Sequence, residues 1–273
     1  MRLGRTIALA VALVAAVIPG LGAYRVVDSV LIVPGGTKTI AAYALTDRED
    51  FNAVKFEAPV ALTSIGEYAF LGCRRLQSIR LPKSVTRLGN GAFRECDALR
   101  EAELPGVGVV PDQCFAWCGK LETAKLSRRC HDIKREAFAY CRSLKAIDIP
   151  AGVTHVGSNA FAFCESLRRV VLSPLVKELE SYAFAECTSL REAVLPGNHN
   201  MLGELIFTGC MNLRRIEVNS LQPPTFDCNS TLFEPDQAEL YDRCELFVPR
   251  GAVTAYRESP WCWSEFREIK EIR

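Results

Sequence analysis

Cysteine is the residue type with the most chemistry to offer in this chain of 273 residues. Its 12 cysteines could form disulfides, bind a metal as thiolates or act as nucleophiles. Seven of them recur every 22 or 23 residues, and each follows a phenylalanine by three positions. Repetition with a period of about 20 to 50 residues is typical of a solenoid, so the spacing indicates a core ladder. Its pairs are Phe70 and Cys73, Phe93 and Cys96, Phe115 and Cys118, Phe138 and Cys141, Phe161 and Cys164, Phe184 and Cys187, and Phe207 and Cys210.

A structural role is the simpler interpretation of this cysteine column, because a buried free cysteine behaves as a small hydrophobic residue. Coils stacked about 5 Å apart would also bring neighbouring cysteines within reach of a disulfide. Disulfides or a thiolate metal site in the column are therefore the alternative. Three more cysteines, Cys228, Cys244 and Cys262, lie outside the repeats, and a disulfide between Cys228 and Cys244 is the alternative to free thiols there.

Histidine gives no sign of catalysis. The chain has three histidines, His131, His155 and His199, and none lies in a recognised nucleophile, zinc or phosphate-loop motif. The formal net charge of +1 also lacks the basic excess that nucleic-acid binding usually requires. We therefore predict that the protein is not an enzyme, that it needs no metal or cofactor, and that nucleic acid is not its partner.

Each repeat must contain the elements that position these side chains. In the first full repeat, Ile79 and Leu81 lie two positions apart, which is the period of a strand with one buried face. The spacings among Ala69, Phe70 and Cys73 place these three residues on one side of a short helical turn. One such unit cannot bury a core alone, but stacked units bury a continuous one.

The repeats divide the chain into four parts. Residues 1–23 combine early arginines, a short apolar run and small residues, which is the pattern of a secretory signal peptide. Residues 24–62 are interpreted as an N-terminal cap that includes a degenerate repeat. Residues 63–220 hold seven repeats of 22–23 residues, and residues 221–273 form an irregular insertion and a C-terminal cap. We expect no membrane span in the mature chain.

Two segments carry a family resemblance. Residues 137–150, AFAYCRSLKAIDIP, resemble the repeat unit of BspA-type leucine-rich-repeat surface proteins of bacteria. The tail at residues 246–256, LFVPRGAVTAY, looks like the closing segment common in that family. The resemblance implies an α/β leucine-rich-repeat solenoid: a curved, horseshoe-like stack of about eight coils, with one strand and one helical turn per coil and a parallel sheet on the concave face. It also implies adhesion or recognition outside the cell, without a catalytic site.

The resemblance places a candidate ligand site on the strand face of the last repeats. Two valines are expected to be exposed there within a rim of arginines, although β-branched residues also favour strands without any ligand. Beside them, three arginines stack one per coil, which suggests an anionic ligand unless Glu165 and Glu192 neutralise them. The rim and valine set is Arg169, Val171, Glu192, Val194, Arg215 and Glu217, and the stacked set is Arg168, Arg191 and Arg214.

These observations predict a monomeric protein, secreted or held at the cell surface or in a periplasm after removal of the signal peptide. Its expected role is adhesion to, or recognition of, an extracellular protein or glycan through the concave strand face. The alternative is a structural or assembly component of the cell envelope that has no small ligand and self-associates. The two roles differ in whether the protein is a monomer.

Overall fold

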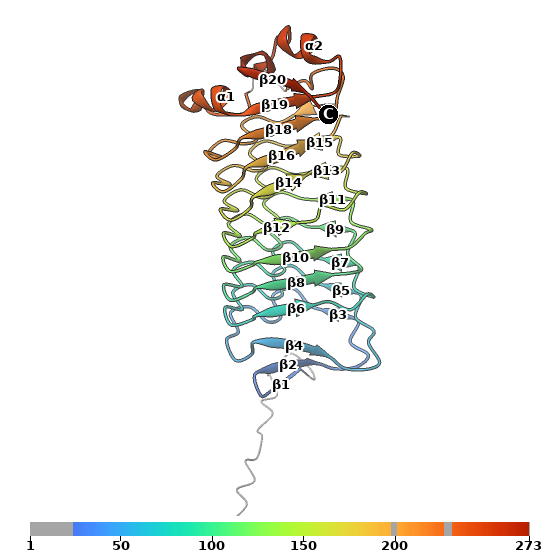
Figure 1. The fold of residues 1–273 in the computed structure, drawn as a ribbon. Coiled ribbons are helices and arrows are strands. Elements are labelled where there is room, and N and C mark those ends of the chain that lie inside the picture. Colours follow the sequence, from blue (N-terminus) through green and yellow to red (C-terminus); the bar gives the residue numbers. More distant parts are fainter. Residues whose placement is uncertain (1–23, 198–200, 227–230, 273) are drawn as a thin grey trace, which may run out of the picture.

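The computed structural model describes residues 24–197, 201–226 and 231–272, and shows a stack of coils along one axis (Figure 1). One face of the stack is built from parallel strands, one per coil, and we call it the strand face. Thr123 on this face pairs with Glu101 in the coil before it and with Ala146 in the coil after it. The strands are β2 (Val30–Val33), β4 (Ala53–Phe56), β6 (Ser78–Arg80), β8 (Glu101–Leu104), β10 (Thr123–Leu126), β12 (Ala146–Ile147), β14 (Arg169–Val171), β16 (Glu192–Leu195), β18 (Arg215–Val218), β19 (Glu245–Val248) and β20 (Glu268–Glu271).

A second set of strands, which the sequence analysis did not predict, lies on another side of the coils. Each is two residues long, and neighbouring coils pair in parallel through these strands in two sheets, one from β3 to β7 and one from β9 to β17. The predicted coil of one strand and one turn therefore has two strands. The second strands are β3 (Thr39–Ile40), β5 (Ser64–Ile65), β7 (Arg87–Leu88), β9 (Val109–Val110), β11 (Asp132–Ile133), β13 (His155–Val156), β15 (Glu178–Leu179) and β17 (Met201–Leu202).

The predicted helical turn around each phenylalanine is wrong, because the segment is a chain of tight turns. Around Phe138, Glu136 and Tyr140 have φ angles of 55° and 62°, and a residue at positive φ cannot continue a right-handed helix. Alternate N–H groups donate to the next coil instead of within the turn. The N–H of Phe138, for example, bonds to the carbonyl oxygen of Ala160 at 2.8 Å. The turns are thus joined to one another from coil to coil.

The predicted phenylalanine and cysteine columns form the core. The seven phenylalanines are fully buried, and their rings stack with centroids 5.1 Å apart at Phe70–Phe93 and 5.9 Å apart at Phe184–Phe207. Each cysteine thiol donates a hydrogen bond to a backbone carbonyl of the preceding coil, as Cys141 Sγ does to Phe115 O at 3.2 Å. The bond gives cysteine a role in this column that alanine, which has no side-chain donor, could not fill.

The ends of the stack add coils to the number expected. The fold has about 10 turns instead of about eight, because β2 precedes the degenerate repeat and β19 and β20 follow the last regular one. At the first end, β1 (Arg25–Val27) pairs antiparallel with β2. Near the other end lie η1 (Pro235–Gln237), α1 (Glu239–Arg243), α2 (Val253–Arg257) and η2 (Cys262–Glu265). The leucine-rich-repeat solenoid itself is confirmed.

Some predictions fall on segments without a described structure. The signal peptide at residues 1–23 lies outside the described residues, as do His199 and Cys228. Cys244 is buried, and its predicted disulfide with Cys228 stays a prediction. Across the described parts of the chain, the helices are all too short or too polar to cross a bilayer.

Candidate recognition site on the strand face

Side chains alternate between the core and the solvent along the strand face. On β14, Val170 is buried, whereas Arg169 and Val171 on either side of it are exposed. In the first half of the stack, the exposed positions form ion pairs: Glu103 lies 2.7 Å from Arg80 and 2.9 Å from Lys125. Exposed pairs of this kind leave a solvated, nearly neutral surface.

The predicted arginine rim is present, but its charges pair within the protein. Glu192 on β16 bridges the two arginines, with its carboxylate 2.9 Å from Arg169 Nε and 3.7 Å from Arg215 Nε. Arg215 also lies 3.0 Å from Glu217. The structure therefore brings together the four charged residues that the sequence indicated, as one neutral network across β14, β16 and β18.

Only one of the two predicted valines is exposed. Val171 is 40% exposed, whereas Val194 is only 9% exposed, although it lies on the outer side of β16 between the inward Ala193 and Leu195. Val194 lies between Val171 and Glu217 on the neighbouring strands, and both cover it. Val171 lacks such cover on its other side because β12 ends at Ile147, before the position that would pair with it. The prediction that Val194 is exposed is wrong for this reason.

The early end of β12 leaves a hollow of about 350 Å³ in the strand face. Its lining includes Ala146, Ala151, Val171 and Pro174, with Arg169 and Asp148 among the polar residues. The two alanines are small, so no long side chain fills the space. The hollow places an apolar surface beside the charged network.

The sequence analysis missed a second part of this surface, at Phe247 on β19. The guanidinium carbon of Arg215 lies 3.4 Å from the centre of the Phe247 ring, which is a cation–π contact. A second hollow, of about 760 Å³, lies here and is lined by both residues and by Lys270 of β20. The alternation of Leu246 and Val248 inward was the signal that could have placed Phe247 outward.

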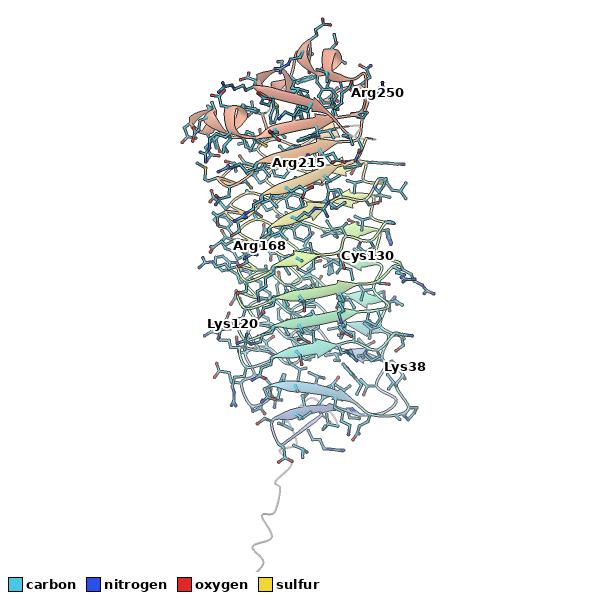
Figure 2. All side chains as sticks on the ribbon, viewed as in Figure 1. Lys38, Lys120, Cys130, Arg168, Arg215 and Arg250 are labelled. Atoms are coloured by element: carbon cyan, nitrogen blue, oxygen red, sulfur yellow. The ribbon has the colours of Figure 1, made fainter. Side chains whose placement is uncertain are left out.

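The stacked arginines are placed as predicted. Arg168, Arg191 and Arg214 are exposed and come directly before β14, β16 and β18. In Figure 2, Arg168 lies toward the side of the stack where the strands begin, and Arg215 lies on the strand face itself. The backbone joins the three positions, because Arg191 N bonds to Arg168 O at 2.9 Å and Arg214 N to Arg191 O at 3.0 Å.

Away from the strand face, the most chemically suggestive cluster is centred on His155 of β13. Its Nδ1 lies 2.7 Å from Asp132, and its Nε2 lies 2.7 Å from Glu180. The nearby Ser158 hydroxyl donates to Glu180 at 2.7 Å, and both ring nitrogens of His155 already bond to carboxylates, so neither accepts from the serine. The cluster thus lacks the nucleophile–base pair of a hydrolase. Among the residues with described structure, no group of histidine, cysteine and carboxylate side chains has a metal-binding arrangement.

The His155 cluster predicts a pH-dependent stability. Burial lowers the pKa of His155, but the hydrogen bonds to Asp132 and Glu180 outweigh it and raise the pKa above the ordinary 6.5. Burial raises the pKa of Glu180, but bonds from Ser158 and His155 hold it below the ordinary 4.5. The contribution of His155 to the free energy of unfolding is complete below the pKa of the histidine in the unfolded chain. It is lost as the pH rises through the higher pKa in the folded protein. The contribution of Glu180 is lost only as pH falls through its lowered pKa.

In urea titrations, His155→Gln is therefore expected to lose more stability relative to the wild type at about pH 6 than at about pH 9. The exposed His131, substituted in the same way, is the control for the loss of a histidine as such. If the wild type is more stable than His155→Gln by the same free energy at both pH values, the raised pKa of His155 would be contradicted.

The comparisons with known proteins agree with this geometry. The sequence matches the model of the BspA type leucine rich repeat region, with six copies, over residues 29–109 and 108–231. A leucine-rich repeat protein from Bacteroides ovatus shares the fold, with a TM-score of 0.61, 19% identity, and coverage of 89% of this chain and 74% of that chain. No curated protein matches the chain.

Two further solved structures are similar over most of the chain. The T. pallidum leucine rich repeat protein is 25% identical, with a TM-score of 0.46 and coverage of 77% of this chain and 85% of its own. A leucine rich cell surface protein from Faecalibacterium prausnitzii is 18% identical, with a TM-score of 0.41 and coverage of 90% of this chain and 79% of that chain. The repeat match spans well over half of the sequence, and the chain belongs to the BspA-type leucine-rich-repeat family.

Proposed function

We propose that this protein is an exported recognition protein that mediates adhesion by binding an extracellular protein or glycan through its strand face, between β12 and β20. Membership of the BspA-type family supports a general role in recognition. The observation that carries the proposal is the exposed Val171 in a hollow beside the Arg169–Glu192–Arg215 network. The rest of the strand face offers mostly paired charges.

The composition of this surface fits a recognition site. Interfaces commonly combine an apolar centre with a polar rim, and arginine and aromatic residues are enriched in them. Here Val171 is the apolar part, Phe247 is the aromatic part, and Arg169 and Arg215 belong to the rim. Glu192 fixes both arginines in place, so binding loses little side-chain freedom.

Export is part of the same proposal. Residues 1–23 have the pattern of a signal peptide, and the BspA-type family is one of surface proteins. The thiols of the core column are buried, which allows them to stay reduced in an oxidising compartment. Removal of the signal peptide would leave a chain that begins with the N-terminal cap.

An assembly role is the competing proposal, and the terminal strands argue against it. At the last strand, β20, the exposed residues are Glu268 and Glu271, with the partly buried Lys270 between them. At the first end, Arg25 of β1 pairs with Glu57 at 2.5 Å. Charged residues on edge strands oppose strand-to-strand association.

The proposal is tested by measuring the binding of the mature protein to a panel of extracellular matrix proteins and glycans, together with its mass in solution by light scattering. We expect at least one saturable interaction and a monomer mass that does not rise with concentration. A mass that rises with concentration, without binding to any member of the panel, would instead support envelope assembly.

A further inference from the structure

One column of side chains beside the strand face has paired charges in the first half of the stack and only arginines in the second half. The column lies seven positions after each phenylalanine of the core ladder and precedes the strand in every coil. Its members from the second repeat onward are Arg100, Glu122, Lys145, Arg168, Arg191 and Arg214.

The first half of this column neutralises itself. Glu122 lies 2.7 Å from Arg100 and 2.6 Å from Lys145, so one carboxylate joins the cations of the coils before and after it. Hydrogen bonds from Lys145 and Arg100 lower the pKa of Glu122 below its ordinary 4.5. This half resembles the ion-pair ladders of the strand face.

The second half of the column contains only arginines, and the nearby acids are occupied elsewhere. Glu165 lies 3.3 Å from Arg142, and Glu192 bridges Arg169 and Arg215. Over the described residues, no carboxylate lies within ion-pair distance of Arg168, Arg191 or Arg214. Among the described residues, Arg214 alone of the three has an internal partner for its guanidinium, since its Nη1 donates to the backbone carbonyl oxygens of Leu213 at 2.9 Å and Met211 at 3.3 Å.

Three guanidinium groups on adjacent coils repel one another. Paired parallel strands lie about 4.8 Å apart, so the charges repeat at roughly this interval along the stack. A ligand that carries negative groups at a similar interval would reduce the repulsion among the three guanidinium groups. Arginine suits such a ligand because its planar group bonds to sulfate or carboxylate oxygens in pairs.

We propose that Arg168, Arg191 and Arg214 bind a linear acidic polysaccharide that runs along the axis of the stack. A sugar unit advances a polysaccharide by about the height of one coil, so successive acidic sugars can meet successive arginines. An acidic peptide fits less well, because its same-face side chains repeat at about 6.7 Å in an extended chain. Such a polysaccharide is met outside the cell, and in this respect the inference rests on the proposed export.

The test is the affinity of the mature protein for heparin, a linear sulfated polysaccharide, and for polygalacturonate, its carboxylated counterpart. The triple variant Arg168→Gln, Arg191→Gln, Arg214→Gln removes the unpaired cations. The matched control Arg100→Gln, Arg142→Gln, Lys145→Gln removes three cations that are paired in the structure. Both variants lower the net charge by the same amount, and their thermal unfolding verifies that each is folded.

We expect the wild type to bind one or both polymers, the control to bind within about threefold of the wild type, and the ladder variant to bind at least about tenfold more weakly. The salt dependence of binding should also be flatter in the ladder variant, because fewer counterions are exchanged. The polymer that binds identifies sulfate or carboxylate as the recognised group.

Two results would overturn the inference. The first is that the wild type binds neither polymer at physiological salt, and the second is that both variants lose affinity equally, which would indicate only a general charge effect. The strand-face variant Val171→Arg separates this site from the proposed function, because it leaves the three arginines unchanged. Loss of polysaccharide binding in the ladder variant alone supports the ladder, whatever the fate of the proposed strand-face partner.

Discussion

Iodoacetamide is expected to modify the seven thiols of the core column in the folded protein at least about a thousandfold more slowly than in the unfolded chain. The reason is that alkylation needs a thiolate that the reagent can reach. Burial raises the pKa of Cys73 to about 12 and raises that of Cys141 well above its ordinary 9.0. All seven thiols are fully buried, so modification must wait for the stack to open.

The measurement combines the intact mass of the purified protein with peptide mapping of each labelled cysteine, after timed exposure to iodoacetamide with and without urea. The described structure contains free thiols at each core-column position, so denatured protein should take up one label per core cysteine. Rapid labelling of Cys141 or Cys164 under native conditions would contradict the buried column. A native mass that is lower by the hydrogens lost to disulfides, with no labelling in urea, would support the alternative of a disulfide-linked ladder.

The sequence could predict the inward columns because burial restricts residue type in every coil. Phe138 stacks on Phe115 and Phe161 at 5.3 and 5.4 Å, and a ring of the same size is needed at each level. Cys141 occupies a position where a small side chain must also donate a hydrogen bond. A repeated physical requirement leaves a repeated residue, so these positions were predicted directly.

The turns could not be predicted in the same way, because their backbone conformation restricts residue type less than burial does. Positive φ usually favours glycine or asparagine, yet Trp117 and Tyr140 adopt φ angles of 66° and 62°. Their rings stack with centroids 3.7 Å apart, and hydrogen bonds to the next coil also hold the conformation. A local spacing of three and four residues therefore suggested a helix where contacts between coils impose turns.

The candidate site was predicted in part. The strand period correctly placed Arg169, Glu192 and Arg215 on the outer face, because alternation depends on the backbone alone. It did not predict that Val194 is buried, since its exposure depends on the length of the neighbouring strands. Nor did it reveal the pairing of both arginines with Glu192, which depends on side-chain conformation.

This pairing changes how the recognition surface should be tested. Reversing the charge of Arg169 and Arg215 would place new carboxylates beside Glu192 and Glu217, and the resulting repulsion would disturb the strand face itself. Any loss of binding would then have two explanations. Val171 has no ion pair and points to solvent, so its substitution leaves the charged network intact.

Val171→Arg is expected to weaken binding of the extracellular partner by at least about tenfold, which corresponds to about 1.4 kcal/mol. The long charged side chain would occupy the hollow and carry an unpaired charge into the interface, and both effects oppose association. Folding should change little, because the valine is 40% exposed. Val60→Arg is the matched control, since Val60 is 46% exposed and lies in the loop between β4 and β5.

The most direct test of the strand-face proposal is therefore a side-by-side titration of the partner found in the binding panel with the wild type, Val171→Arg and Val60→Arg. Equal thermal unfolding of the three proteins establishes that each is folded. We predict that Val60→Arg binds like the wild type and that Val171→Arg loses at least about tenfold in affinity. Equal binding by all three proteins would contradict the assignment of recognition to this surface.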